Sequence, residues 1–148
     1  MFLIFYLSAE VISYSQPIAD FSSDFQKGCI PLTIHFQDIS AGTLNTWLWD
    51  FGNGNTSGKQ NPEANYTKPG VYSVRLTVGN GSGSDTLFRQ GFIKVYQRPT
   101  SNFSADTILG CAPFIVEFSD ASVPGSSSIK EWLWDFGDGN NSTLKQPK

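Results

Sequence analysis

Two stretches of the sequence carry residue types that could form an acidic site. The letters W-D-F-G-N-G run from Trp49 to Gly54, and W-D-F-G-D-G run from Trp134 to Gly139. In the structural alternative, the aromatic side chains fill a core and the glycines make a turn. We favour that alternative, because a structural unit must be rebuilt in every repeat and a catalytic site need not be. The signature residues given this structural role are Trp49, Asp50, Phe51, Gly52, Gly54, Tyr72, Trp134, Asp135, Phe136, Gly137, Asp138 and Gly139.

Several aspartates could bind calcium, which prefers hard oxygen ligands. These are Asp20, Asp24, Asp38, Asp50, Asp120, Asp135 and Asp138. No D-x-D-x-D-G loop is present, so we interpret them as solvated loop carboxylates. We predict no metal and no other cofactor, and calcium stays as the alternative.

The only histidine, His35, could act as a catalytic base. It lies on the outward phase of its expected strand, and Glu117 takes its place in the second repeat. No G-x-S-x-G motif or second histidine completes a triad. The net charge of −3, with no run of Lys or Arg, argues against a nucleic-acid partner. We therefore predict that the chain is not an enzyme.

Trp47 and Trp132 could stack on sugar rings, because one tryptophan of each pair could be surplus to the core. A core or half-core position is the alternative that we favour. Cys29 and Cys111 occupy equivalent positions in successive repeats. Equivalent points in stacked domains lie much farther apart than the ~7 Å limit for a disulfide, so we do not expect these two cysteines to pair. A bridge to another segment remains open.

The elements that position these residues occur twice. Phe21 corresponds to Phe103 at an offset of 82 residues, and Trp47 to Trp132 at an offset of 85 residues. The difference falls in a longer loop at 121–128, where an insertion is tolerated. The second copy stops at Pro147-Lys148, and we expect 63–96 to have no counterpart in it. We expect the sequence to be a fragment of a longer repeat protein.

Alternating apolar residues predict strands over 30–36, 47–51, 72–78 and 92–96, and over 112–118 in the second copy. Asn53-Gly54 and Asp138-Gly139 predict type I′ hairpin turns, whose two central residues need positive φ. Trp49 stands where an Ig-like domain has its buried tryptophan, and Tyr72 has the spacing of a tyrosine corner. The fold class is therefore all-β, an Ig-like antiparallel β-sandwich.

Trp49–Gly54 and Trp134–Gly139 resemble the W-D-F-G-D-G signature of polycystic-kidney-disease (PKD) domains. The strand 31–36 before the signature and the P-G-V-Y-S-V-R-L-T-V run at 69–78 after it fit the same family. The resemblance implies an extracellular β-sandwich module that recurs in tandem in cell-surface proteins or beside the catalytic domains of secreted hydrolases. It also implies spacing, adhesion, and protein or carbohydrate contact as roles.

The apolar start and the small residues near Ser15 predict a secretory signal peptide over 1–15. A complete domain over 16–97 and the N-terminal half of a second over 98–148 would follow. We predict a non-catalytic extracellular or cell-surface repeat whose partners are other domains of the same longer chain and extracellular proteins or glycans. The alternative is a carbohydrate-binding accessory module of a secreted hydrolase.

Overall fold

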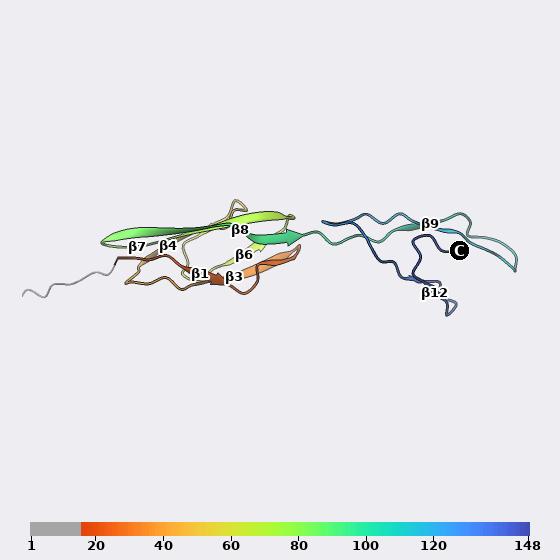
Figure 1. Cartoon of the computed structure of the whole chain (residues 1–148), viewed down its shortest axis with the longest axis horizontal. Coiled ribbons are helices and arrows are strands. Elements are labelled where there is room, and N and C mark those ends of the chain that lie inside the picture. Colours follow the sequence, from red (N-terminus) through yellow and green to blue (C-terminus); the bar gives the residue numbers. More distant parts are fainter. Residues whose placement is uncertain (1–15) are drawn as a thin grey trace, which may run out of the picture. The chain divides into compact units, whose positions relative to one another are not determined.

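The computed structural model describes residues 16–148, so the predicted signal peptide over 1–15 lies outside the described residues. The described residues form strands joined by turns and loops (Figure 1). Residues 16–148 contain no helix long and apolar enough to cross a membrane. The strands of the first copy are β1 (Phe21–Ser23), β2 (Lys27–Cys29), β3 (Leu32–Asp38), β4 (Thr46–Asp50), β5 (Thr56–Ser57), β6 (Glu63–Tyr66), β7 (Gly70–Asn80) and β8 (Gly83–Tyr96). Those of the second copy are β9 (Phe103–Ala105), β10 (Phe118–Asp120), β11 (Trp134–Asp135) and β12 (Asn141–Ser142).

The first copy, residues 16–97, is a sandwich of two sheets. One sheet has the strand order β1-β3-β6, and the other has the order β2-β8-β7-β4-β5. The predicted all-β sandwich is confirmed, with one departure from an antiparallel arrangement, since β2 pairs parallel with β8. β1 and β2 follow each other along the chain but join different sheets, so this one segment closes an edge of each sheet.

The core lies between the two sheets, and the predicted alternation places it there. Ile34 and Phe36 are buried in β3, while their neighbour His35 is exposed. β7 buries Val74, Leu76 and Val78 on one side in the same way. Burial of apolar area at about 25 cal/mol per Å² is the main favourable term in folding. The other buried apolar residues are Ala19, Phe21, Trp49, Phe51, Ala64, Tyr66, Ile93 and Val95.

The turn after β4 differs from the predicted type I′ turn. Positive φ angles occur at Gly52 (72°) and Gly54 (90°), and no non-glycine residue in the described range has one. Asn53 therefore lies outside the left-handed region that a type I′ turn would require. The loop has five residues, 51–55, and the Phe51 N–H donates to the Asn55 carbonyl oxygen at 3.2 Å. Gly137 and Gly139 repeat the pattern, so the Asp138-Gly139 prediction is wrong for the same reason.

The last strand begins earlier than predicted. β8 runs from Gly83 to Tyr96 and contains the expected 92–96 strand as its final part. The preceding turn is fixed by the Asn80 side chain, whose Oδ1 accepts from the Ser82 N–H at 2.8 Å. Within β8, Gly91 has φ of 60° and donates its N–H to Ser73 Oγ at 3.0 Å. β8 has 14 residues, and its first part was not predicted because most of its side chains are exposed and show no buried alternation.

The second copy forms only local strand pairs. β9 pairs with β10, and β11 pairs with β12. The strand predicted over 112–118 is present only from Phe118 onward, as β10. In the first copy the equivalent strand β3 lies between β1 and β6. The expectation that 63–96 has no counterpart is one residue too long, because Lys148 follows the equivalent of Pro62 and so corresponds to Glu63. The other three β6 residues have no equivalent in this chain, so β10 lacks a full ladder on one edge.

The compact units of the structure do not follow the repeat boundary. Residues 27–32 and 65–71 group with 94–148, and the rest of the described chain forms the other unit.

Candidate functional site

The aromatic residues of the first signature lie inside the sandwich. The Trp49 ring lies 5.2 Å from the Phe21 ring and 5.5 Å from the Phe36 ring, measured between centroids. The Phe51 and Phe36 rings are 5.2 Å apart. The buried indole N–H of Trp49 donates to the Lys59 carbonyl oxygen at 2.9 Å, so no polar cost opposes its burial.

The polar residues of the first signature bond within their own turn. Asp50 Oδ1 accepts from the Gly52 N–H at 2.9 Å, and Asn53 Oδ1 accepts from the Asn55 N–H at 3.0 Å. These are Asx turns, in which a side-chain oxygen caps the backbone two residues on. A Cβ on Gly52 would lie 2.4 Å from the Ser73 carbonyl oxygen, so this position needs glycine for space as well as for φ.

The second signature repeats these local contacts. Asp135 Oδ1 accepts from the Gly137 N–H, and Asp138 Oδ1 accepts from the Asn140 N–H, both at 2.9 Å. The Trp134 indole N–H donates to the Leu144 carbonyl oxygen at 2.8 Å. The hydrogen bonds from Asn140 lower the pKa of the Asp138 carboxyl. Asp50, Asp135 and Asp138 therefore act as turn acceptors.

The aspartates that the sequence offered as calcium ligands do not come together as an acidic cluster within 16–148. Within 16–148, no three His, Cys, Asp or Glu side chains are grouped so as to hold a metal ion. Tyr72 lies half-buried in β7, two residues before the buried Val74. Cys29 is half-buried, Cys111 is exposed, and both are free thiols.

Trp47 and Trp132 each donate the indole N–H to an aspartate that the sequence did not identify as their partner. Trp47 Nε1 lies 2.7 Å from Asp38 Oδ2, and Trp132 Nε1 lies 2.9 Å from Asp120 Oδ2. The repeated Asp-x-Ser at 38–40 and 120–122 was the available signal. In both copies the serine N–H donates to the same aspartate, at 3.0 and 2.9 Å.

These hydrogen bonds lower the pKa of both aspartates. Burial raises the pKa of Asp38, but hydrogen bonds from Ser40, Trp47 and Gln60 outweigh burial and lower it. The pKa of Asp120 is lowered by Ser122 first and then by Trp132. Trp47 and Trp132 are both half-buried, and each indole ring is oriented by its hydrogen bond to the aspartate. The Lys145 ammonium lies 5.8 Å from the Trp132 ring centroid, where it competes for the face a sugar would need.

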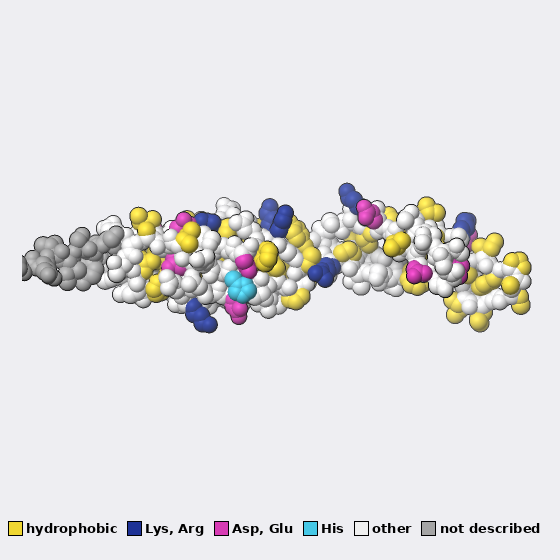
Figure 2. All heavy atoms as spheres, turned by 90° about the horizontal axis from the view of Figure 1, so that it is seen from below, with side chains coloured by type: hydrophobic (Ala, Val, Ile, Leu, Met, Phe, Trp, Pro, Cys, Tyr) yellow, Lys and Arg dark blue, Asp and Glu magenta, His cyan; other side chains and the backbone are white. Residues whose placement is uncertain are grey.

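His35 lies on the surface, as its strand phase predicts. Its Nδ1 is 2.9 Å from Asp24 Oδ2 and its Nε2 is 3.6 Å from Glu63 Oε2. Figure 2 shows the histidine beside acidic side chains on the exposed face. In the second copy Glu117 replaces His35 and Lys148 replaces Glu63, so the carboxylate and its nitrogen-bearing partner exchange positions, with Lys148 Nζ 3.1 Å from Glu117 Oε1. A pair of side chains whose members can be exchanged in this way fits a structural role better than a catalytic one.

Arg89 is a further residue that sequence reasoning missed. Its guanidinium lies 2.8 Å from Asp20 Oδ1 and covers the rings of Phe21 and Phe92, at 4.6 and 5.1 Å from their centroids. Asp85 also accepts from the Ala19 N–H at 2.7 Å. Through these contacts β8 holds the N-terminal segment of the first copy against the edge of the core.

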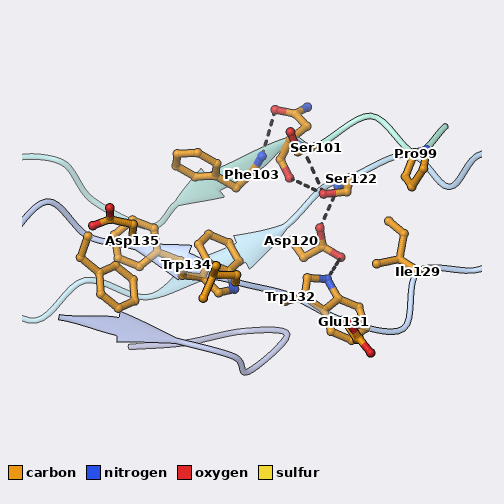
Figure 3. A pocket seen from close by; sticks show the side chains of 14 residues that line it. Pro99, Ser101, Phe103, Asp120, Ser122, Ile129, Glu131, Trp132, Trp134 and Asp135 are labelled. Carbon is orange, nitrogen blue, oxygen red and sulfur yellow. Dashed lines mark hydrogen bonds between the residues drawn. The ribbon is translucent and has the colours of Figure 1, made fainter.

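A hollow of about 770 Å³ opens in the second copy. Aromatic rings line it together with the polar side chains of Asp120, Ser122 and Glu131 (Figure 3). Phe103 is 6.2 Å from Phe118 and 5.6 Å from Trp134 between centroids. These rings are the equivalents of Phe21, Phe36 and Trp49, so the hollow is the uncovered counterpart of the first core.

The family model for the PKD domain matches residues 14–93. The chain belongs to the PKD domain family. This match confirms the resemblance carried by the signature. It places the Trp49–Gly54 turn and the strands around it inside one PKD domain.

Two curated relatives contain a similar segment. The pre-pro-metalloprotease PrtV of Vibrio cholerae is 42% identical over 74 residues, which are 50% of this chain and 8% of PrtV. The collagenase ColA of Bacillus cereus is 36% identical over 63 residues, which are 43% of this chain and 6% of ColA. This PKD chain therefore spans less than a tenth of either relative.

Two solved structures are also similar. The PKD1 domain of PrtV is 39% identical, with a TM-score of 0.47, and the match covers 55% of this chain and 98% of that domain. A structure from work on carbohydrate-binding modules of the β-sandwich superfamily is 19% identical, with a TM-score of 0.50, covering 72% of this chain and 54% of the other. At that identity the second likeness shows the β-sandwich fold alone.

Proposed function

We propose that this PKD chain is a non-catalytic extracellular repeat that spaces or presents other domains of a longer protein. The observation that carries the proposal is how the polar side chains of the signature are bonded in both copies. Its carboxylate and amide oxygens bond to the backbone of their own turn, at Asp50 and Asn53 and again at Asp135 and Asp138. Polar side chains that are engaged in this way stabilise the turns of a structural module. They do not form a group of side chains suited to catalysis within the signature.

The relatives support an accessory role. PrtV and ColA are named as a metalloprotease and a collagenase, and the segment similar to this chain is 8% and 6% of them. A segment that small serves a larger protein as one of its modules. The linker Gln97–Thr100 contains Pro99, whose fixed φ restricts the backbone between the copies, as a spacer requires. The predicted signal over 1–15 would direct the chain to the cell surface or the medium.

Turnover assays on the purified full chain test the absence of catalysis. Casein, gelatin, and soluble cellulose and chitin derivatives serve as substrates, and the expected product release equals that of the buffer. Asp50→Asn and Asp135→Asn are the matched variants, because each keeps an oxygen acceptor for the turn. Hydrolysis by the wild-type chain that either variant abolishes would overturn the proposal.

The alternative is a carbohydrate-binding accessory module of a secreted hydrolase. The observation that favours it is the half-buried Trp47, whose ring is held in one orientation by the bond to Asp38. A held aromatic ring loses little conformational entropy when a sugar stacks on it. A glycan array with Trp47→Ala as the test variant and Leu48→Ala as the exposed neighbour separates the two functions. Binding that Trp47→Ala removes and Leu48→Ala keeps would establish the alternative, and we expect no binding from the spacer.

A further inference from the structure

The backbone at the end of β8 is hydrogen-bonded to a residue of each copy. The Ile30 N–H donates to the Tyr96 carbonyl oxygen at 2.9 Å, and the Gln97 N–H donates to Ser126 Oγ at 2.7 Å. Ile30 belongs to the first copy and Ser126 to the second. All four residues lie in the same compact unit. The chain is therefore held at this point from both directions.

The two bonds meet on one peptide group. The Tyr96 carbonyl and the Gln97 N–H belong to the same amide, which is planar and resists rotation about its C–N bond. The free torsions are ψ of Tyr96 before the amide and φ of Gln97 after it. Rotation about the first would break the bond to Ile30, and rotation about the second would break the bond to Ser126.

The loop around Ser126 follows the linker more closely than this one bond requires. The Ser126 N–H also donates to the Gln97 carbonyl oxygen at 3.0 Å, so one residue engages both backbone polar groups of Gln97. Gly125 permits this approach, because an added Cβ there would overlap the Gln97 carbonyl oxygen. Thr100 and Val123 exchange N–H to carbonyl bonds in both directions, each at 2.9 Å. The loop therefore bonds to both ends of the linker.

These contacts come from the loop that is longer in the second copy. Across 121–128 the offset between the copies changes from 82 to 85, so the second copy has three more residues there. In the first copy, an added Cβ on Gly42 would lie 3.0 Å from the carbonyl oxygen of Gln16, the equivalent of Arg98. The longer loop reaches one position farther back along the chain, to Gln97, which directly follows β8.

We propose that the loop at 121–128 holds the junction between the copies in one backbone conformation. The inference rests on the proposed spacer function and assigns its stiffness to Gly125 and Ser126, acting on Gln97. Pro99 adds a fixed φ within the same linker. A junction held in this way restricts the swing that a flexible linker would allow. The three additional residues thus convert a tether into a stiff connection.

Amide hydrogen exchange of the full 148-residue chain, followed by NMR, tests the proposal. An amide that is hydrogen-bonded within the fold exchanges only when that bond opens. Ser126→Ala removes the Oγ acceptor, and Gly125→Ala overlaps the Gln97 carbonyl oxygen. Each should raise the exchange rate of the Gln97 amide roughly tenfold or more. Ser127→Ala, the matched control in the same exposed loop, should leave that rate unchanged.

Two further readouts come from the same samples. The indole N–H shifts of Trp132 and Trp134 should stay unchanged in the variants, which shows that the local structure of the second copy persists. From ¹⁵N relaxation we expect one rotational correlation time for both copies of the wild-type chain and two separate values for Gly125→Ala.

Rapid exchange of the wild-type Gln97 amide, or two separate correlation times in the wild-type chain, would overturn the proposal. Equal Gln97 exchange rates in wild type, Ser126→Ala and Gly125→Ala would overturn it as well. None of these results bears on catalysis, which the turnover assays test separately. A flexible junction would therefore remove the stiff connection and leave the non-catalytic assignment standing.

Discussion

Trp49 and Trp134 occupy equivalent positions and make the same hydrogen bond, yet they differ in burial. Each indole N–H donates to a backbone carbonyl ten residues on, at 2.9 and 2.8 Å. Trp49 is fully buried, and Trp134 is half-buried beside an open hollow. The signature thus forms its turn from local contacts, while burial of its rings needs the distant strands β7 and β8.

The difference separates two kinds of stabilisation in one repeat. Asx turns, indole hydrogen bonds and ring–ring contacts recur in both copies. Removal of apolar area from water is complete only in the first. Because hydrophobic burial dominates folding energetics, we expect only the first copy to unfold cooperatively. Substitutions at equivalent positions should therefore have unequal effects.

The largest contrast is expected between Trp49→Ala and Trp134→Ala. Truncating a buried tryptophan costs about 3–5 kcal/mol, comparable to the stability of a small domain. Trp49→Ala should abolish the thermal transition of the first copy, whereas Trp134→Ala should leave it in place. Circular dichroism melts of the full chain measure both. A Trp49→Ala melt that matches wild type would refute the assignment of Trp49 to the core.

The next contrast lies within one turn, between Gly52→Ala and Gly54→Ala. Both positions have positive φ, which costs an L-residue about 1–2 kcal/mol. Only at Gly52 would the new Cβ meet backbone, the Ser73 carbonyl oxygen at 2.4 Å, while Gly54 faces open space. Gly52→Ala should lose about 1–3 kcal/mol more than Gly54→Ala in urea unfolding, the usual cost of overpacking. Equal losses would mean that β7 does not approach the turn.

The loss of stability at acid pH should show a smaller contrast, between Asp38→Asn and Asp120→Asn. The pKa of Asp38 is lowered in the folded state, so its stabilisation is full above the ordinary aspartate pKa and is lost as pH falls through the lowered value. Asp38→Asn should flatten the loss of melting temperature of the first copy below about pH 4. Asp120→Asn should leave that loss unchanged, although its pKa is lowered too. Matching acid profiles for wild type and Asp38→Asn would contradict this role.

The smallest effect is expected at the reversed surface pair. His35→Glu alone sets like charges beside Glu63 and Asp24 and should destabilise the first copy at pH 5.5. Adding Glu63→Lys should restore stability, because it recreates the Glu117–Lys148 arrangement. Exposed pairs contribute about 0.2–1 kcal/mol, so a double-mutant cycle at low salt is needed. A coupling energy of zero would show that the reversal between copies has no energetic meaning.

Much of the fold of the first copy can be predicted from the sequence, because apolar and polar residues alternate along its strands. Alternation in 30–36 and 72–78 identified the buried faces, and the W-D-F-G stretch identified the strand with Trp49. The Asn53-Gly54 turn was misassigned, because Gly52 before it takes the positive φ and the loop closes over five residues. The partners of Trp47 and Arg89 were also missed. They join residues 9 and 69 positions apart. The repeated Asp-x-Ser could have indicated the partner of Trp47, whereas no local pattern indicates the contact between Arg89 and Asp20.

The second copy marks the limit of reading strands from alternation. Residues 112–118 carry the same pattern as 30–36, yet the structure forms a strand only from Phe118. Alternation specifies which side chains a strand would bury, and a strand still needs backbone partners on its edges. The partners of β3 come partly from β6, which the pattern within 112–118 cannot supply.

Acrylamide quenching of single-tryptophan variants tests the central claim most directly. One variant keeps Trp49 and the other keeps Trp134, with the remaining tryptophans changed to phenylalanine. We predict that Trp49 is shielded and emits at short wavelength, while Trp134 is quenched several-fold more strongly. Strong quenching of Trp49, or equal quenching of the two, would contradict the conclusion that the signature builds a sandwich core which only the first copy completes.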